Sequence, residues 1–184
     1  MHELIKKRRS PLAFSSQMIE QDQLDIIFEA GIWAASCFNE QPWRFIYATK
    51  DNEAEYNNIL DCIVPGNQEW AQKAPILMIT VAKTNFTQFD DPNVHAWHDV
   101  GMAMGNMSIQ AISMDIYIHQ MGGFISEKAI ENLNIPDGYE PVAAVAMGYL
   151  GDPHELSDAL RDRALSERTR KPFEELIFKD KWPE

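Results

Sequence analysis

Apolar residues divide the chain into segments with helical spacing and segments that are apolar throughout. Residues 21–34 place Leu24, Ile27, Phe28 and Gly31 on one face, which predicts an amphipathic helix. Shorter helices are predicted at about residues 3–8, 53–63, 68–73 and 126–133. Strands are predicted at residues 43–49, 76–82 and 141–147. The segment 76–82 is nearly all apolar, so we expect it to be a central strand buried on both faces.

The longest helix candidate covers residues 94–120. Its apolar side chains lie all around the helix axis: Val100, Met102, Met104, Met107, Ile109, Ile112, Met114, Ile116 and Ile118. A helix that is apolar on every side has to be buried on every side. In a chain of 184 residues this is easier when a second subunit covers one face, so the pattern favours a dimer. The methionines have a simpler alternative role, because Met fills irregular core space.

The last part of the chain, from Gly148 to residue 184, is polar and shows no clear core pattern. It still carries Phe173, Leu176 and Trp182, which favour wrapping around another surface over disorder. No repeat or flexible linker divides the sequence, so we expect one domain over residues 1–184, with a tail from about residue 160 that wraps another surface. Strands and helices alternate without clean βαβ units. This predicts an α+β fold with three α-β-α layers and a mixed, mainly antiparallel sheet.

The charge of the chain is unevenly distributed. The net charge of −12 argues against nucleic acid or an anionic membrane as the main partner. Nine of the 16 basic residues lie in two short segments, near residues 6–9 and 161–171. This placement suggests an anion site where the two ends of the chain meet. The alternative is two solvated basic patches flanking an acidic body.

Several other classes of protein are disfavoured. No apolar run approaches the roughly 18 residues of a membrane-spanning helix, and the basic N-terminus is not followed by an apolar segment. Cys37 and Cys62 are typical of free thiols in a reducing compartment, so we expect a cytoplasmic protein. Glycine-rich nucleotide motifs and a nucleophile elbow are missing. His95, His98 and Asp99 lack a further ligand at a recognised spacing, so we interpret them as polar residues at a helix start and expect no metal.

Three segments carry side chains suited to binding. Arg8-Arg9-Ser10 offers two guanidinium groups and a hydroxyl, which suit a phosphate. The loop at residues 36–43 offers hydroxyl and amide groups that can contact the edge of a polar heterocycle. Residues 168–172 form a second phosphate-suited cluster. Taken singly, each has a structural alternative: charge at a helix end, side chains that brace a loop, or surface arginines.

Taken together and in order, these segments resemble the nitroreductase family of flavoproteins, nearly from end to end. The resemblance is strongest at residues 8–14, 36–43 and 168–172. It extends to Asn67 with Trp70 and Ala74-Pro75, and to Gly122-Gly123-Phe124.

The resemblance implies a homodimer that binds FMN at the subunit interface, with two sites per dimer. Arg8, Arg9 and Ser10 would hold the phosphate and ribityl side, together with Arg168 and Arg170. Asn67 would face the flavin ring, and Gly122 and Gly123 would bring backbone N–H groups close to it. The other subunit would contribute Ser36, Cys37, Asn39 and Gln41. The long helix would form the dimer core, and the tail would embrace the partner.

The implied reaction is ping-pong: NADH or NADPH reduces the flavin at N5, and a nitroaromatic, a quinone or a similar small-molecule acceptor then takes the electrons. The cofactor carries the chemistry, so no catalytic acid or base is expected. Leu12 departs from the family, which often has a basic residue there. The chain also lacks the long insertions of larger members. The alternatives are another flavin reaction on the same scaffold, such as dehalogenation, enone reduction or flavin breakdown, or a poorly active flavin-binding protein.

Overall fold

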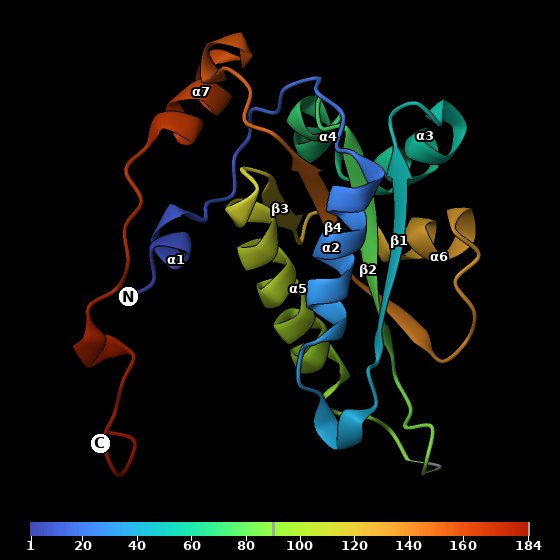
Figure 1. Cartoon of the computed structure of the whole chain (residues 1–184). Helices are drawn as coiled ribbons and strands as arrows, with labels where there is room; N and C mark the ends of the chain where they lie inside the picture. Colours follow the sequence, from blue (N-terminus) through green and yellow to red (C-terminus); the bar gives the residue numbers. More distant parts are fainter. Residues whose placement is uncertain (90, 184) are drawn as a thin grey trace.

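The computed structural model, which describes residues 1–89 and 91–183, has three layers with a sheet in the middle (Figure 1). One face of the sheet is covered by α2 (Gln21–Ile32) and α5 (Ala96–Ser113). The other face is covered by α3 (Glu53–Cys62), α4 (Pro65–Ala71) and α6 (Ser126–Asn132). The remaining helices are α1 (Glu3–Lys7), α7 (Asp158–Leu165) and three short 3-10 turns, η1 (Cys37–Asn39), η2 (Pro153–Glu155) and η3 (Phe173–Glu175).

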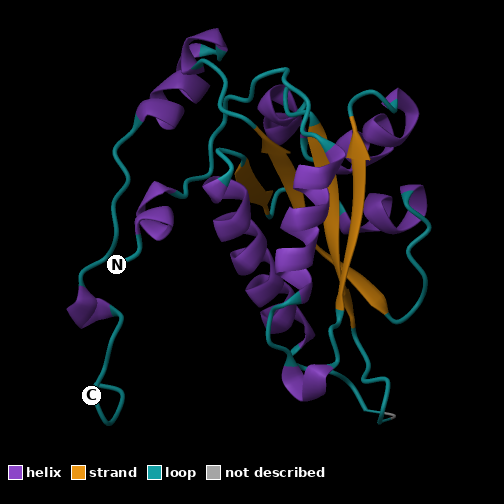
Figure 2. Cartoon of the chain, viewed as in Figure 1, coloured by secondary structure: helices purple, strands orange, loops and turns teal. Residues whose placement is uncertain are grey.

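The sheet contains β1 (Trp43–Thr49), β2 (Ile76–Lys83), β3 (Tyr117–Met121) and β4 (Tyr139–Gly148) in the order β1-β2-β4-β3 (Figure 2). Among these described strands all three pairings are antiparallel, whereas the sequence predicted a mixed, mainly antiparallel sheet. The α+β class and the three layers are confirmed. β2 is buried at every position except Lys83, as its apolar sequence predicted.

The long helix predicted over residues 94–120 was wrong at its C-terminal end. Helix α5 ends at Ser113, and Asp115 adopts a left-handed conformation with φ 58°. The chain then enters β3, which pairs with β4. The apolar pattern continues through this turn without a glycine or a proline, so nothing in the pattern marked the change from helix to strand.

Two apolar cores fill the spaces between the layers. On the α2 and α5 side, Gly31 allows close packing, because a Cβ atom there would lie 2.8 Å from the Cγ of Met107. On the opposite side, Trp70 is completely buried and its ring stacks with Phe14 at a centroid distance of 6.3 Å. Leu12 is 3% exposed and belongs to this second core.

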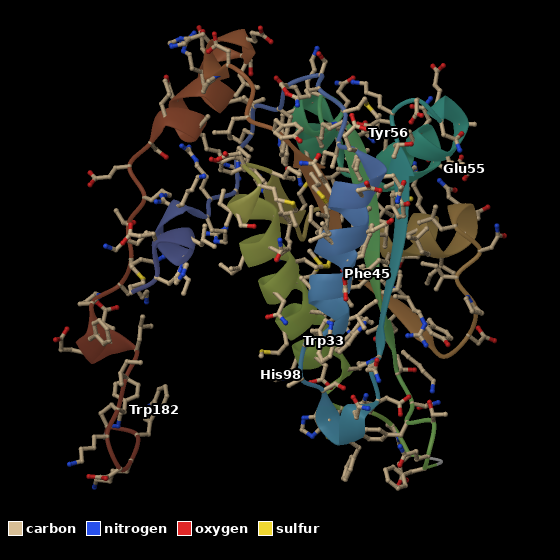
Figure 3. The ribbon with its side chains drawn as sticks, viewed as in Figure 1. Trp33, Phe45, Glu55, Tyr56, His98 and Trp182 are labelled. Carbon is tan, nitrogen blue, oxygen red and sulfur yellow. The ribbon has the colours of Figure 1, made fainter. Side chains whose placement is uncertain are left out.

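Two apolar surfaces lie outside these cores. One face of α5 is open, since Trp97 is 53% exposed and Met102 is 43% exposed. Burial on every side, which the sequence pattern demanded, is therefore not reached within one chain. After α7 the tail runs along the outside past α1, and Phe173, Ile177 and Trp182 are exposed (Figures 1 and 3).

Candidate functional site

A cavity of about 350 Å³ lies where the two basic segments meet. It lies between the segment that follows α1, strand β3 and the C-terminal end of α7. Its lining residues are Arg8, Arg9, Ser10, Leu12, His119, Arg163, Ala164, Ser166, Glu167, Arg168 and Arg170. Five of them are arginines and one is a carboxylate. The fold therefore brings together the phosphate-site residues predicted from both ends of the chain.

The arginines in this cavity repel one another. Burial lowers the pKa of Arg8 below its usual value, and the charges of Arg170 and Arg168 lower it further. The side chain of Arg8 donates a hydrogen bond to Ser10 Oγ at 3.4 Å. A bound anion would offset the repulsion, because opposite charges stabilise the charged form of a group. The cavity is thus electrostatically suited to a phosphate.

Arg9 and Arg168 also hold the walls of the cavity together. Arg9 donates to the carbonyl of Ala164 at 2.8 Å, and its buried Nε has no partner among the described residues. Arg168 donates to the carbonyls of Arg8 at 2.6 Å and Lys6 at 2.8 Å. These bonds fasten the tail to the N-terminal segment. Arg8 is therefore freer than Arg9 and Arg168 to bind a ligand.

A second cavity, of about 410 Å³, adjoins the first across Arg8 and Ser10. It lies between the open face of α5 and β3. Its other lining residues are Gly101, Gly105, Asn106, Ser108, Ile109, Ile118 and Gln120. His119 of β3 lines the arginine cavity, and Gly122 directly follows the end of this strand. β3 therefore connects the arginine cavity with the residues predicted to face the flavin ring.

The residues predicted to face the flavin ring lie together at the end of β3. Asn67 Nδ2 donates to the carbonyl of Gly123 at 3.3 Å, and Val64 N–H donates to the same carbonyl at 3.1 Å. A Cβ atom at position 123 would lie 2.5 Å from Asn67 Nδ2, whereas at Gly122 it would meet nothing within 4 Å. Gly123 thus packs against Asn67, and the backbone of Gly122 is open to an approaching group. Arginines at one end and bare backbone at the other fit the phosphate and ring of FMN.

The loop with Ser36, Cys37, Asn39 and Gln41 is not part of these cavities. It lies at the N-terminal end of α5, where Cys37 N–H donates to Asp99 Oδ2 at 2.9 Å (Figure 1). One chain therefore keeps this loop apart from the residues predicted to share its site.

The backbone of this loop is strained. Phe38, Asn39 and Gln41 have φ values of 52°, 55° and 51°, although none of them is glycine. The Ser36 hydroxyl accepts from Gln41 N–H at 3.0 Å, which helps to hold the turn. Such conformations cost about 1–3 kcal/mol each and cluster at functional sites.

Several residues near these sites were not singled out from the sequence. Asp99 was interpreted only as a polar residue at a helix start, yet it is 2% exposed and braces Cys37. His119 was not assigned a role, because an isolated histidine has no motif around it. Arg163 was counted only as one of the basic residues of segment 161–171 and was not named as a site residue. Glu40 was not assigned a role, although it lies in the loop motif at residues 36–43.

Glu40 joins the loop to the segment after β2. Its side chain is 3% exposed and accepts hydrogen bonds from Lys83 Nζ and Thr87 N–H, both at 2.9 Å, and from the Thr87 hydroxyl. Burial by itself would raise the pKa of this carboxyl, but the bonds from Thr87 and Lys83 outweigh it and lower the pKa to about 2.

We expect Glu40→Gln to lower the free energy of unfolding by about 2 kcal/mol at pH 7, because it removes charged hydrogen bonds. A lowered pKa contributes stability above the unfolded value near 4.3, and this stability is lost as the pH falls through about 2. Urea denaturation from pH 7 to pH 2 should therefore show the wild type and the variant converging in acid. Glu131→Gln, at an exposed position of α6, is the matched control. A difference that stays constant over the whole pH range would contradict the assignment.

Two further observations concern metals and membranes. Over residues 1–89 and 91–183, histidine, cysteine and acidic side chains form no group of three or more that is suited to a metal ion. In the same part of the chain, no helix has both the length and the apolar character needed to cross a bilayer.

Comparisons with known proteins point to one family. Residues 5–149 match the model of the nitroreductase family. A solved structure described as an oxidoreductase containing FMN is 32% identical, with a TM-score of 0.93 over 100% of this chain and 93% of the other. A putative NADH dehydrogenase/NAD(P)H nitroreductase of Archaeoglobus fulgidus is 26% identical over 97% of both chains. An uncharacterized 15.4 kDa protein of Mycolicibacterium smegmatis is 34% identical over 84 residues, which are 46% of this chain and 56% of that protein.

The match to the family model covers most of the chain. This chain therefore belongs to the nitroreductase family.

Proposed function

We propose that this protein is an FMN-dependent oxidoreductase that passes electrons from NADH or NADPH to a small organic acceptor. The cavity with five arginines and one carboxylate is the observation that carries the proposal. It is supported by the 32% identical structure described as containing FMN and by the nitroreductase name of the Archaeoglobus fulgidus relative.

The residues of the proposed site have different roles in binding FMN. Arg8, Arg170 and Ser10 would contact the phosphate, while Arg9 and Arg168 hold the walls of the cavity through their bonds to backbone carbonyls. Asn67 and the open backbone of Gly122 would contact the ring. Bound FMN would supply the redox chemistry, carrying electrons from NAD(P)H to a nitroaromatic or quinone acceptor.

We further propose that the protein acts as a homodimer. The open face of α5 combines Trp97 and Met102 with Gly101 and Gly105, whose missing side chains let another helix approach closely. A second copy on this face would bring its strained loop, with Ser36, Cys37, Asn39 and Gln41, to the site that one chain leaves incomplete. The exposed apolar side chains of the tail would pack on the partner.

The direct test is a visible spectrum of the purified protein, followed by release and identification of any chromophore. We expect a yellow protein that releases about one FMN per chain and oxidises NADH or NADPH when a quinone or nitroaromatic is added. Sedimentation should give twice the chain mass. A colourless protein that does not take up added FMN would refute the proposal. FMN binding without NAD(P)H oxidation would indicate a flavin-binding protein instead of an enzyme.

A further inference from the structure

His119 forms part of the wall of the arginine cavity. Its Nδ1 lies 2.7 Å from the carbonyl oxygen of Pro11, the residue that follows Ser10. Its ring lies against Trp70, with a centroid distance of 4.4 Å and an interplanar angle of 33°. The imidazole is therefore fixed between the buried core and the segment that presents Arg8, Arg9 and Ser10 to the cavity.

The bond to Pro11 determines which ring nitrogen carries the proton. A carbonyl oxygen can only accept, so Nδ1 is the donor, and Nε2 is unprotonated when the ring is neutral. Among the described residues Nε2 has no hydrogen-bond partner. Burial lowers the pKa of His119, and the charges of Arg163 and Arg8 lower it further, although the bond to Pro11 acts in the opposite direction.

The charges that face His119 are almost all positive. Arg8 and Arg9 come from the N-terminal segment, and Arg163, Arg168 and Arg170 come from α7 and the tail, with Glu167 as the one acidic residue in the lining. Trp70 on α4 and Leu12 add no charge. The five arginines and Glu167 give this lining an excess charge of +4, and a phosphate dianion would lower it to +2. Less positive charge near the ring favours the protonated form of His119.

We propose that His119 is a positioning residue of the phosphate site, which holds the Ser10–Leu12 segment through Pro11 and takes up a proton at Nε2 when a phosphate enters. The inference rests on the proposed function, because FMN is the phosphate carrier. Nδ1 remains a donor in both protonation states, so the segment stays in place while the site gains a positive charge. By reciprocity, protonation of His119 strengthens phosphate binding to the same extent that the phosphate favours protonation.

The test compares the wild type with His119→Asn, whose amide N–H replaces the Nδ1 donor, and with His119→Leu, which has none. FMN and riboflavin, which lacks the phosphate, are titrated calorimetrically at pH 6.5 in two buffers of different ionisation enthalpy. We expect the wild type to take up more protons with FMN than His119→Asn does, and we expect no such difference with riboflavin. His119→Asn should bind FMN without this additional uptake, and His119→Leu should bind it more weakly at every pH.

The FMN affinity is then measured from pH 8 to pH 5.5. The affinity of the wild type should rise relative to His119→Asn as the pH falls, by about tenfold for each unit by which FMN raises the pKa of His119. The phosphate of FMN titrates in the same range, but it does so equally in both proteins, so the ratio isolates His119. Equal proton uptake and parallel pH profiles in the two proteins would overturn the inference and leave the proposed function intact. A wild type that binds no FMN would overturn both.

Discussion

Replacing Arg8 with alanine is expected to weaken FMN binding by about 10- to 100-fold, the equivalent of one or two charged hydrogen bonds. Arg8 borders both adjoining cavities, and within residues 1–89 and 91–183 its side chain donates only to Ser10. Its removal also relieves repulsion with Arg168 and Arg170. The unliganded protein should therefore lose no stability, which separates a binding defect from a folding defect. The measurement is a fluorescence titration of apoprotein with FMN, alongside thermal unfolding of the apoprotein.

The matched control for this experiment is Arg161→Ala on α7. Arg161 pairs with Asp158 at 2.9 Å and does not line the cavity. The Arg161→Ala substitution therefore removes one positive charge, as Arg8→Ala does, without removing a side chain that contacts the phosphate. A surface pair of this kind contributes about 0–1 kcal/mol, and FMN affinity should stay within about twofold of the wild type. If both variants bind FMN equally well, Arg8 does not contact the phosphate.

Replacing Trp70 with alanine is expected to lower the free energy of unfolding by about 3–5 kcal/mol. Trp70 is completely buried and packs against both Phe14 and His119. Its removal would leave a large cavity between α4 and the sheet, which the neighbouring elements cannot close without moving β3. Urea denaturation followed by far-ultraviolet circular dichroism measures the change without relying on the fluorescence of the lost indole.

Trp70→Phe provides the comparison for the alanine variant. The indole Nε1 of Trp70 is buried without a partner among the described residues, so phenylalanine removes an unsatisfied donor and keeps most of the packing. We expect a loss of about 1–2 kcal/mol, well below that of the alanine variant. Equal losses for the two variants would show that ring packing does not account for the stability of this core.

The elements with a clear apolar signature were predicted well from the sequence. Strand β1 was predicted with its bounds, residues 43–49, and β2 to within one residue. β3 was missed because helix α5 and the strand share one continuous apolar pattern, and the turn between them uses Asp115 where a glycine would have been a recognisable signal. Helix α4 begins earlier than predicted, because Pro65 begins this helix instead of only ending the one before it.

The arginine cluster was predictable because it depends on which residue types occur near the two ends of the chain. The functions of individual arginines were not. Arg9 and Arg168 bind backbone carbonyls, and this depends on how the tail folds back on the N-terminal segment. The role of His119 could not be predicted from the sequence for the same reason, because it depends on contacts with Pro11 and Trp70, which are distant in sequence. Tertiary packing brings such residues together, and no local motif in a single sequence indicates these contacts.

The strand order β1-β2-β4-β3 has a consequence for how the chain folds. β2 pairs with β1 across residues 50–75, and β3 pairs with β4 across residues 122–138, but β2 and β4 are separated by residues 84–138. Closing the longest connection costs the most chain entropy, so we expect the two outer pairs to form first and the central pairing last. Until then β2, which is apolar on both faces, has one edge unpaired. An expressing cell therefore has to protect this strand from aggregation during the slow step.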